Sequence, residues 1–326
     1  MTKAVQILKA DQAMAAALAC LQRGEPVAIP TETVYGLAAD AKNGEAVAAI
    51  FKAKRRPRFN PLICHVSDMG MARRLAEFDP VSERLAEAFW PGPLTIVLPL
   101  KPGSGIHPLT AAGLDTVGLR MPQGFARDLI AAFGRPLAAP SANSSGRISA
   151  TSAEAVAADL GARIALVVDG GPAAIGVEST IVRVSAGQAE ILRPGGISAE
   201  AIAALGMEVT RAKSGGHIVA PGMLASHYAP RAALRLDATS VEPDEALLAF
   251  GPVRAAGNPK ASLNLSPSSD LSEAARNLFS HLQALDAAGV ASIAAEPVPH
   301  NGLGAAINDR LARAAAPRPA NSEAGQ

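Results

Sequence analysis

The densest set of charges in the chain lies in the stretch FKAKRRPRFNPLICHV, residues 51–66. Its five cations fall within seven positions: Lys52, Lys54, Arg55, Arg56 and Arg58. The preceding residues have helical spacing, and Pro57 must end that helix. Cations in a last helical turn are stabilised by the helix dipole, so a solvated helix end is one interpretation. Because an apolar strand carrying His65 follows at once, convergence of these charges on an anion is the other.

Three further stretches place polar side chains or glycines just beyond an apolar strand. They are AIPTETVYGLAADA (28–41), PLAAPSANSSGRISATSAEAV (136–156) and VDGGPAAIGVESTIV (168–182). Open α/β sheets bind ligands beyond the carboxyl ends of their strands, and glycines let the backbone approach a ligand closely. The same hydroxyls would also suit local turns, a helix cap or a polar surface loop. The sequence leaves both interpretations open.

Two arginines stand apart from the basic run. Arg120 lies inside the apolar strand VGLRMP, where a charged group needs a carboxylate partner from the protein or from a substrate. Arg193 precedes Pro-Gly-Gly, just ahead of a helical segment. The chain has no GxxxxGK[ST] loop, no GxGxxG and no GxSxG elbow. If the protein binds phosphates, we therefore expect cations and hydroxyls to hold them, with Mg²⁺ carried by the nucleotide.

The elements that must position these residues alternate between helical and strand patterns. Helices are predicted at 11–23, 44–55, 81–89, 123–133, 152–160 and 198–204. Strands are predicted at 26–31, 61–66, 94–100, 116–121, 165–169 and 179–184, with a short one before Pro140. Several strands are apolar at successive positions, as expected when helices cover both faces of a sheet. Residues 1–206 are therefore predicted to form one α/β domain.

The rest of the chain predicts a linker, a smaller domain and a tail. Residues 207–233 are rich in glycine and proline, which indicates a linker, although His227 and Tyr228 could make contacts. Strands are then predicted at 233–236, 246–251 and 291–296, and helices at 270–288 and 303–315. Residues 234–316 thus predict a small α/β domain, and 317–326 a disordered tail.

Composition excludes several classes of protein. Of 326 residues only 3% are aromatic, so stacking platforms for single-stranded nucleic acid are not expected. The formal net charge of +1 does not predict that the chain as a whole binds DNA or RNA electrostatically. The two cysteines, Cys20 and Cys64, have no metal-ligand spacing and favour a reducing compartment. No apolar run reaches the roughly 18 residues of a membrane span, so a cytoplasmic protein is expected.

Seven segments, in this order, resemble the YrdC-like family, whose members are L-threonylcarbamoyladenylate synthases. They are PTETVYGLAADA, KRRPRFNPLICHV, FWPGPLTIVL, VGLRMP, APSANSSGRIS, VESTIV and LRPGGIS. The resemblance spans about residues 12–200, and the linker APGMLASHYAP with the second domain resembles the longer, two-domain type. It implies a YrdC-like twisted mixed sheet with flanking helices, followed by a smaller Rossmann-like α/β domain.

The resemblance also implies a reaction. L-Threonine, bicarbonate and ATP would give threonylcarbamoyl-AMP and pyrophosphate, with Mg²⁺ entering on the nucleotide and no metal site in the protein. A partner transferase would then move the threonylcarbamoyl group to the adenosine beside the tRNA anticodon. The protein itself need not hold tRNA tightly.

The family's functional residues map onto positions of this chain. The Lys-x-Arg and Ser-x-Asn tetrad falls on Lys54, Arg56, Ser141 and Asn143. ATP contacts fall on Arg56, Asn60, Thr116, Ser141, Ser149, Arg193 and Tyr228. Threonine contacts fall on Thr33, His65, Arg120, the backbone near Ala139, and Ser179. Tyr228 is expected to close over the site, whereas Lys52, Arg55 and Arg58 are expected to be solvated.

Two alternatives are weaker. An RNA-binding module built on residues 52–58 conflicts with the low aromatic content and the near-neutral charge. A related carbamoyl-transfer domain, of the kind found in hydrogenase maturation proteins, usually carries zinc-finger cysteines that this chain lacks.

Overall fold

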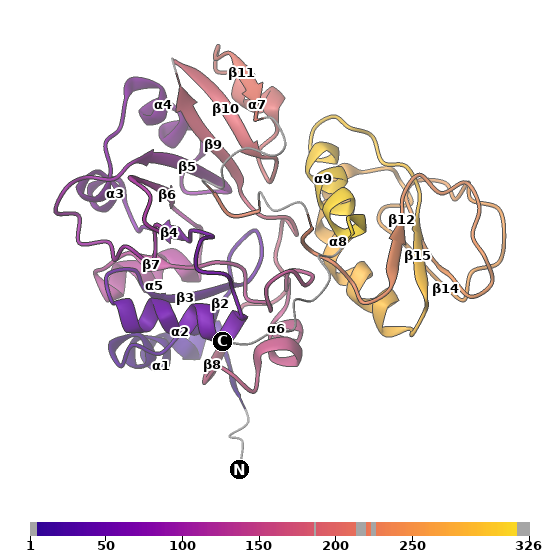
Figure 1. The fold of residues 1–326 in the computed structure, drawn as a ribbon, viewed down its shortest axis with the longest axis horizontal. Coiled ribbons are helices and arrows are strands. Elements are labelled where there is room, and N and C mark those ends of the chain that lie inside the picture. The colour runs from indigo at the N-terminus through magenta and orange to yellow at the C-terminus, as the bar shows by residue number, and fades with distance from the viewer. Residues whose placement is uncertain (1–4, 186, 213–219, 223–225, 318–326) are drawn as a thin grey trace.

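The computed structural model describes residues 5–185, 187–212, 220–222 and 226–317, which form a larger and a smaller lobe (Figure 1). The larger lobe holds an 11-stranded sheet within the described residues, in the order β1-β8-β2-β3-β7-β4-β6-β5-β9-β10-β11. Its strands are β1 (Gln6–Lys9), β2 (Val27–Ile29), β3 (Gly36–Asp40), β4 (Ile63–His65), β5 (Leu94–Pro99), β6 (Thr116–Arg120), β7 (Leu137–Ala138), β8 (Leu166–Asp169), β9 (Thr180–Ser185), β10 (Gln188–Arg193) and β11 (Val209–Arg211). The sheet mixes parallel pairs, such as β4 with β6, and antiparallel pairs, such as β5 with β6.

Helices cover this sheet and close its apolar core. They are α1 (Ala10–Gln22), α2 (Gly44–Lys54), α3 (Met69–Leu75), α4 (Pro80–Phe89), α5 (Phe125–Phe133), α6 (Ala153–Leu160) and α7 (Ala199–Ala203). One continuous cluster of buried side chains joins the helices to the strands, and strands such as β3 are buried along their whole length. The prediction of a mixed α/β sheet with flanking helices is confirmed.

Some local predictions need correction. Helix α1, predicted at 11–23, begins at Ala10 with Lys9 at its N-cap, and no side chain caps it. Strands β1, β3, β10 and β11 and helix α3 lie outside the predicted ranges. Strand β1 is four residues long and mostly exposed, and it pairs with β8 about 160 residues later. Its hydrophobic pattern is therefore weak, and its existence depends on a distant partner.

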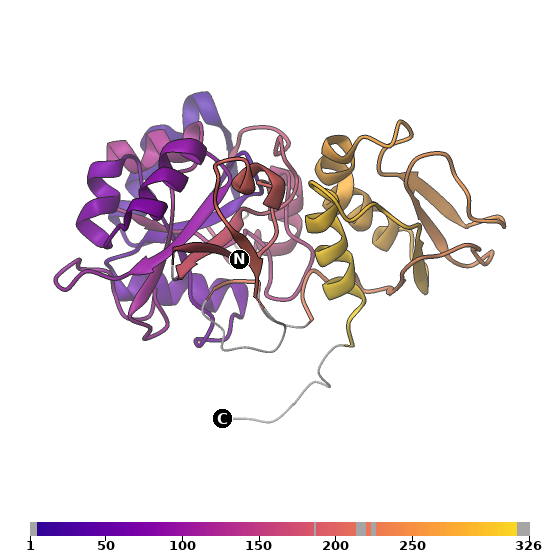
Figure 2. The ribbon, with the colours of Figure 1, turned by 90° about the horizontal axis from the view of Figure 1, so that it is seen from above.

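The smaller lobe is built on a four-stranded sheet with the order β12-β15-β13-β14, in which every described pair is parallel. Its strands are β12 (Ala233–Arg235), β13 (Ala246–Ala249), β14 (Ala261–Asn264) and β15 (Ser292–Ala295), with helices α8 (Leu271–Ala287) and α9 (Gly304–Ala315). Figure 2 shows both helices on the side of this sheet that faces the larger lobe. The predicted second α/β unit is confirmed.

The two lobes share an apolar cluster. Val34, Ile148 and Val177 of the larger lobe pack in one buried cluster with residues of the smaller lobe, including Phe279 of α8. Gly176 lies directly on α8, where an added Cβ would be 2.4 Å from the carbonyl oxygen of Ala275. Such contact between backbones leaves no layer of water, so the smaller lobe packs directly on the larger one.

The predicted linker, 207–233, is described only in part, since residues 213–219 and 223–225 lie outside the described residues. Its first part includes strand β11, which pairs with β10 and so extends the first sheet. The predicted tail lies outside the described residues except for Pro317. Among the described residues, no helix combines the length and the hydropathy needed to cross a membrane.

Candidate active site

A cavity with about 550 Å³ of empty space, part of it open to solvent, lies where the central strands end. Nine of the residues predicted for the site line it: Thr33, Arg56, His65, Arg120, Ala139, Ser141, Ser179, Arg193 and Tyr228. They come from segments up to 195 residues apart in sequence, and the fold brings them together.

Strand pairing explains the centre of the cavity. Strands β4 and β6 are parallel neighbours in a register that places His65 opposite Arg120. Strand β7 pairs antiparallel with β4 on its other side, so Ala139 lies beside the start of β4, and its N–H donates to the carbonyl oxygen of Ile63 at 3.0 Å. An isolated bridge between Gly36 and Ser141 then fixes the loop that carries the predicted Ser-x-Asn pair.

Arg120 has a carboxylate partner within the protein. Its Nη2 donates to Oε1 of Glu32 at 2.6 Å, and both side chains are almost fully buried. Its Nε donates to the carbonyl oxygen of Gly92 at 3.3 Å, and Glu32 also accepts from the backbone N–H of Gln123. The sequence left open whether the partner belonged to the protein or to a substrate; Glu32 is the protein partner. The guanidinium is thereby fixed while still lining the cavity.

Arg56 turns inward at the end of α2. The helix ends with Arg55 in the left-handed region (φ 52°), which reverses the chain. Arg56 then donates to the carbonyl oxygens of Asn60 and Pro61 at 3.2 and 2.8 Å. Burial lowers the pKa of Arg56 to about 10, so it stays charged at neutral pH. Lys52, Arg55 and Arg58 are exposed, as predicted.

Arg193 is the third cation at the cavity. Its Nη2 donates to the carbonyl oxygen of Ser179 at 2.8 Å and to the hydroxyl of the same residue at 3.2 Å. The hydroxyl of Ser179 is also 2.8 Å from that of Thr95 on β5. Burial lowers the pKa of Arg193. The β9–β10 hairpin thus brings Arg193 to the side chain at the start of β9.

Lys54 occupies a different position from the three arginines. Its Nζ donates to the backbone carbonyls of Ser141 and Asn143, both at 2.5 Å, and it is not among the residues that line the cavity. Burial, together with Arg56, lowers the pKa of Lys54 well below its usual value. Lys54 therefore joins the end of α2 to the loop that carries Ser141 and Asn143.

Several buried polar atoms around the cavity lack a hydrogen-bond partner within the described residues. They are both side-chain atoms of Asn60, Nδ1 of His65, Oδ1 of Asn143 and Nδ1 of His227. Unpaired buried polar atoms are costly. Two others within the described residues, Oγ of Ser82 on α4 and Nδ1 of His281 on α8, lie outside this group. Burial lowers the pKa of His65 and of His227 to about 3, so both imidazoles are neutral at pH 7.

Thr116 and Ser149, predicted to contact ATP, do not line the main cavity. Thr116 lines a smaller cavity, which adjoins the first at Pro221. The hydroxyl of Ser149 donates to Oε1 of Glu178 at 2.5 Å. Asn60 and Asn143 lie behind the cavity wall, next to Arg56 and Lys54 respectively.

Glu178 was not predicted as a site residue, although it lies in the motif VESTIV. Glu178 lines the cavity and pairs with Arg310 of α9 at 2.7 Å. A carboxylate directly before the predicted contact Ser179 was a usable signal. For Arg310 no local signal exists, because its contacts to the larger lobe are set only by the docking of α9.

Comparison with known proteins identifies related sequences for both parts of the chain. Residues 19–195 match the family model Sua5_yciO_yrdC, described as "Telomere recombination", and residues 197–316 match "Threonylcarbamoyl-AMP synthase, C-terminal domain". The chain is 41% identical to the threonylcarbamoyl-AMP synthase of Bacillus subtilis, with 94% of each chain covered. It is also 41% identical to that of Pyrococcus abyssi, over 90% of this chain and 91% of the relative.

The crystal structure of P. abyssi Sua5 complexed with L-threonine matches with a TM-score of 0.87 at 36% identity, covering 95% of this chain and 98% of the other. At this coverage the match extends over both lobes. On sequence and on structure, over nearly its whole length, the chain belongs to the threonylcarbamoyl-AMP synthase family.

Proposed function

We propose that this protein is an L-threonylcarbamoyladenylate synthase, which makes threonylcarbamoyl-AMP and pyrophosphate from L-threonine, bicarbonate and ATP. The observation that carries the proposal is the convergence of Arg56, Arg120 and Arg193 on one cavity. Among the described residues that line this cavity, Glu178 is the only carboxylate, and Arg310 offsets its charge. The cavity therefore suits the carboxylate of threonine and the phosphates of ATP together.

Threonine is proposed to bind in the inner part of the cavity. Arg120, held by Glu32, would meet its carboxylate, and Thr33, His65, Ser179 and the backbone at Ala139 would supply hydrogen bonds. His65 is neutral at pH 7, so it can accept or donate a hydrogen bond without adding charge. This assignment gives the unpaired Nδ1 of His65 a partner.

ATP is proposed to bind between the inner part and the linker. Arg56, Ser141 and Arg193 would contact the phosphates, and Tyr228 would cover them. Thr116, in the adjoining small cavity, would contact the nucleotide from that side. Asn60 and Ser149 would support the nucleotide from behind, Ser149 through Glu178. Lys54 would act by holding the backbone of Ser141 and Asn143 in place.

The proposed chemistry needs positioning and charge more than a general base. Bicarbonate condenses with the amine of threonine to give a carbamate and water. A carbamate oxygen then attacks the α-phosphorus of ATP, the bond from that phosphorus to the bridging oxygen breaks, and pyrophosphate leaves. Two anions must approach each other, so fixed guanidiniums lower the barrier by offsetting their repulsion.

Mg²⁺ is proposed to enter as part of the nucleotide substrate. No group of three or more histidine, cysteine, aspartate or glutamate side chains suited to a metal gathers within the described residues. Glu178 already accepts hydrogen bonds from Ser149 and Arg310. The phosphates of ATP are therefore the proposed ligands of the ion.

The domain organisation follows the same proposal. Residues 1–206 would form the catalytic domain and 234–316 a domain that closes it, with 207–233 connecting them. A separate transferase would take threonylcarbamoyl-AMP to the adenosine beside the tRNA anticodon, so tight binding of tRNA by this protein is not required.

The test is pyrophosphate release from ATP by the full chain, with L-threonine and bicarbonate added or withheld. Release that needs both is the expected result, and mass spectrometry should then find threonylcarbamoyl-AMP. Release that ignores threonine, or that is equally fast with L-serine, would contradict the proposed substrate.

A further inference from the structure

Arg310 is an internal cation that joins the two lobes. It lies on α9 of the smaller lobe, and its side chain is fully buried. Its Nε donates to Oε2 of Glu178 at 2.7 Å, its Nη2 to the carbonyl oxygen of Pro194 at 3.0 Å and its Nη1 to Asp309 at 2.5 Å. All three guanidinium nitrogens therefore donate a hydrogen bond, and two of the three partners, Glu178 and Pro194, belong to the larger lobe.

Glu178, the main partner of Arg310, is part of the cavity wall. Burial alone would raise the pKa of Glu178, but Arg310, Arg193 and the hydroxyl of Ser149 hold it at about 2. Glu178 is therefore a full negative charge beside the proposed phosphate site. Without Arg310 this charge would repel the nucleotide and would attract Arg193, the next cation that acts on it.

Tyr228, which also lines the cavity, depends on the same helix. Its backbone lies in the left-handed region (φ 63°), where a tyrosine needs support from its surroundings. The guanidinium of Arg310 is 5.0 Å from the centre of its ring, and Phe279 of α8 stacks on it at 5.5 Å. The adjacent N–H of His227 donates to the carbonyl oxygen of Arg313, one turn along α9.

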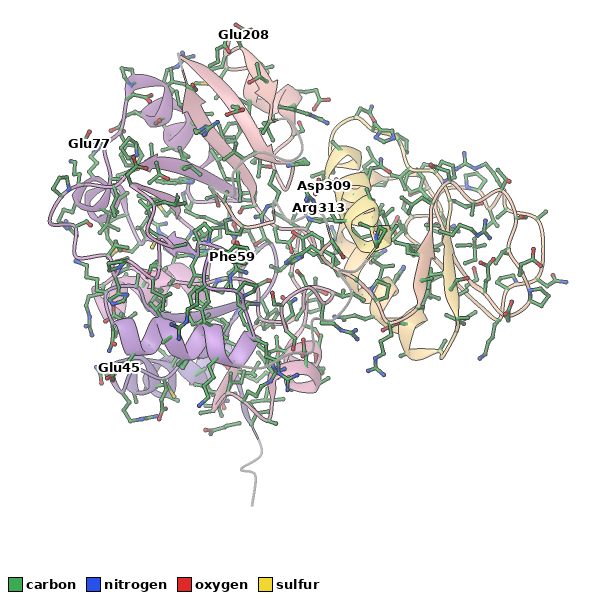
Figure 3. The ribbon with its side chains drawn as sticks, in the orientation of Figure 1. Glu45, Phe59, Glu77, Glu208, Asp309 and Arg313 are labelled. Atoms are coloured by element: carbon green, nitrogen blue, oxygen red, sulfur yellow. The ribbon has the colours of Figure 1, made fainter. Side chains whose placement is uncertain are left out.

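The other charges on α9 support this arrangement. Asp309 accepts hydrogen bonds from both Arg310 and Arg313, and it is partly shielded from solvent. In Figure 3, Asp309 and Arg313 lie on the side of α9 that faces the larger lobe. On this side α9 therefore carries a connected set of charges, with Asp309 between Arg310 and Arg313 as their shared acceptor.

We propose that Arg310 is a positioning residue of the active site, which reaches from the second lobe to fix Glu178 and Tyr228 around the nucleotide. The inference rests on the proposed function and extends it, because it assigns the smaller lobe a direct part in building the ATP site. Arg310 does not line the cavity, so its effect on turnover passes through those two side chains.

The test is a double-mutant cycle on the full chain with Arg310→Met, Glu178→Gln and the double variant. Arg310→Met should lower kcat/KM for ATP by at least about tenfold, because it leaves a buried carboxylate unpaired. In the Glu178→Gln background the same change should cost less than about threefold, because no charge remains to be offset. A merely structural role predicts equal losses in both backgrounds, and that result would overturn the proposal.

Two further variants separate packing from charge. Arg310→Lys keeps the cation but loses the fork, so it should recover part of the loss seen with methionine. Arg235→Met removes a cation from the opposite side of the smaller lobe, where Arg235 pairs with Glu245 at 2.6 Å. This control should leave kcat/KM for ATP unchanged. If it costs as much as Arg310→Met, the stability of the lobe and not the Arg310 contact is responsible.

Calorimetric titration of the same variants with ATP tests the role of Arg310 separately from the proposed function. If the wild-type chain releases no threonine-dependent pyrophosphate, the proposed function fails. The effect of Arg310 on the dissociation constant for ATP, in the presence and absence of the Glu178 charge, still measures its positioning role. An unchanged dissociation constant together with an unchanged kcat/KM in Arg310→Met would refute that role.

Discussion

Arg120 and Glu32 form a buried ion pair at 2.6 Å, with one partner in the middle of the sheet and the other in the loop after β2. The pair explains how the protein tolerates a guanidinium among apolar strands. Glu32 is not among the residues that line the cavity, whereas Arg120 is. The carboxylate thus supports the cation from behind and leaves its remaining face to a ligand.

Replacement of Glu32 by alanine should raise KM for threonine. The change removes the bond to Arg120 and a second one from the N–H of Gln123. An increase of about tenfold is expected, the size of one hydrogen bond to a charged group, with KM for ATP changed little. Steady-state pyrophosphate release at varied threonine measures it. Glu83→Ala, in the partly exposed pair with Arg73, is the matched control and should have no effect. A lower KM in Glu32→Ala would mean that Glu32 competes with the substrate for Arg120.

Arg56 and Arg58 should differ sharply although they are two residues apart. Arg56 lines the cavity and is buried, whereas Arg58 is exposed. Arg56→Ala should lower kcat by about 100-fold or more, because a preorganised cation beside the reacting phosphate is lost. Arg58→Ala should stay within about twofold of wild type. Single-turnover assays at saturating ATP measure both variants. Similar losses would show that the assignment of Arg56 to the cavity and of Arg58 to the solvent is wrong.

The stability of the protein should fall when the pH is lowered from 7 to 5. The pKa of buried His65 is about 3, below its usual value of 6.5, so the unfolded chain binds more protons in this range. Each pH unit below 6.5 therefore costs the folded state about 1.4 kcal/mol for this residue, down to about pH 3. Burial also lowers the pKa of His227 to about 3, so this residue adds to the loss of stability at low pH.

Urea unfolding of wild type and His65→Asn at pH 7, 6 and 5 tests this pH dependence. The variant should lose less stability than wild type on acidification, by about 1 kcal/mol per pH unit. Glu178 does not interfere, because the stability gained from its lowered pKa is present above about pH 4.5 and is lost only below it. Parallel curves for the two proteins would mean that His65 is protonated in the folded state.

Gly176 should be sensitive to a single methyl group. It has φ +82°, and an added Cβ would be 2.4 Å from the backbone of α8. Gly176→Ala should destabilise the chain by about 3 kcal/mol, from strain and from overpacking together. Gly134 has a similar φ, +71°, with open space around it, so Gly134→Ala should cost only about 1 kcal/mol. Thermal unfolding compares them, and equal costs would mean that α8 can move away from Gly176.

Much of the local structure could be predicted from the sequence because it depends on local patterns. The apolar strands, the helix that ends before Pro57 and the helix capped by Ser152 follow from residue types and their spacing. The order of seven motifs also indicated the family, which the comparisons confirm. Strand β1 could not be predicted in this way, since it is short, exposed and paired with a distant strand.

The sequence by itself determined which chemical groups the site has, namely the arginines, the histidine and the hydroxyls that could meet two anions. Only the tertiary structure decided how each group is used. Lys54 and Arg56 are two residues apart and both bind backbone carbonyls, yet only Arg56 lines the cavity. Arg310 reaches Glu178 across 132 positions because α9 docks on the larger lobe. Burial and pairing depend on contacts between distant segments, and no local pattern encodes those contacts.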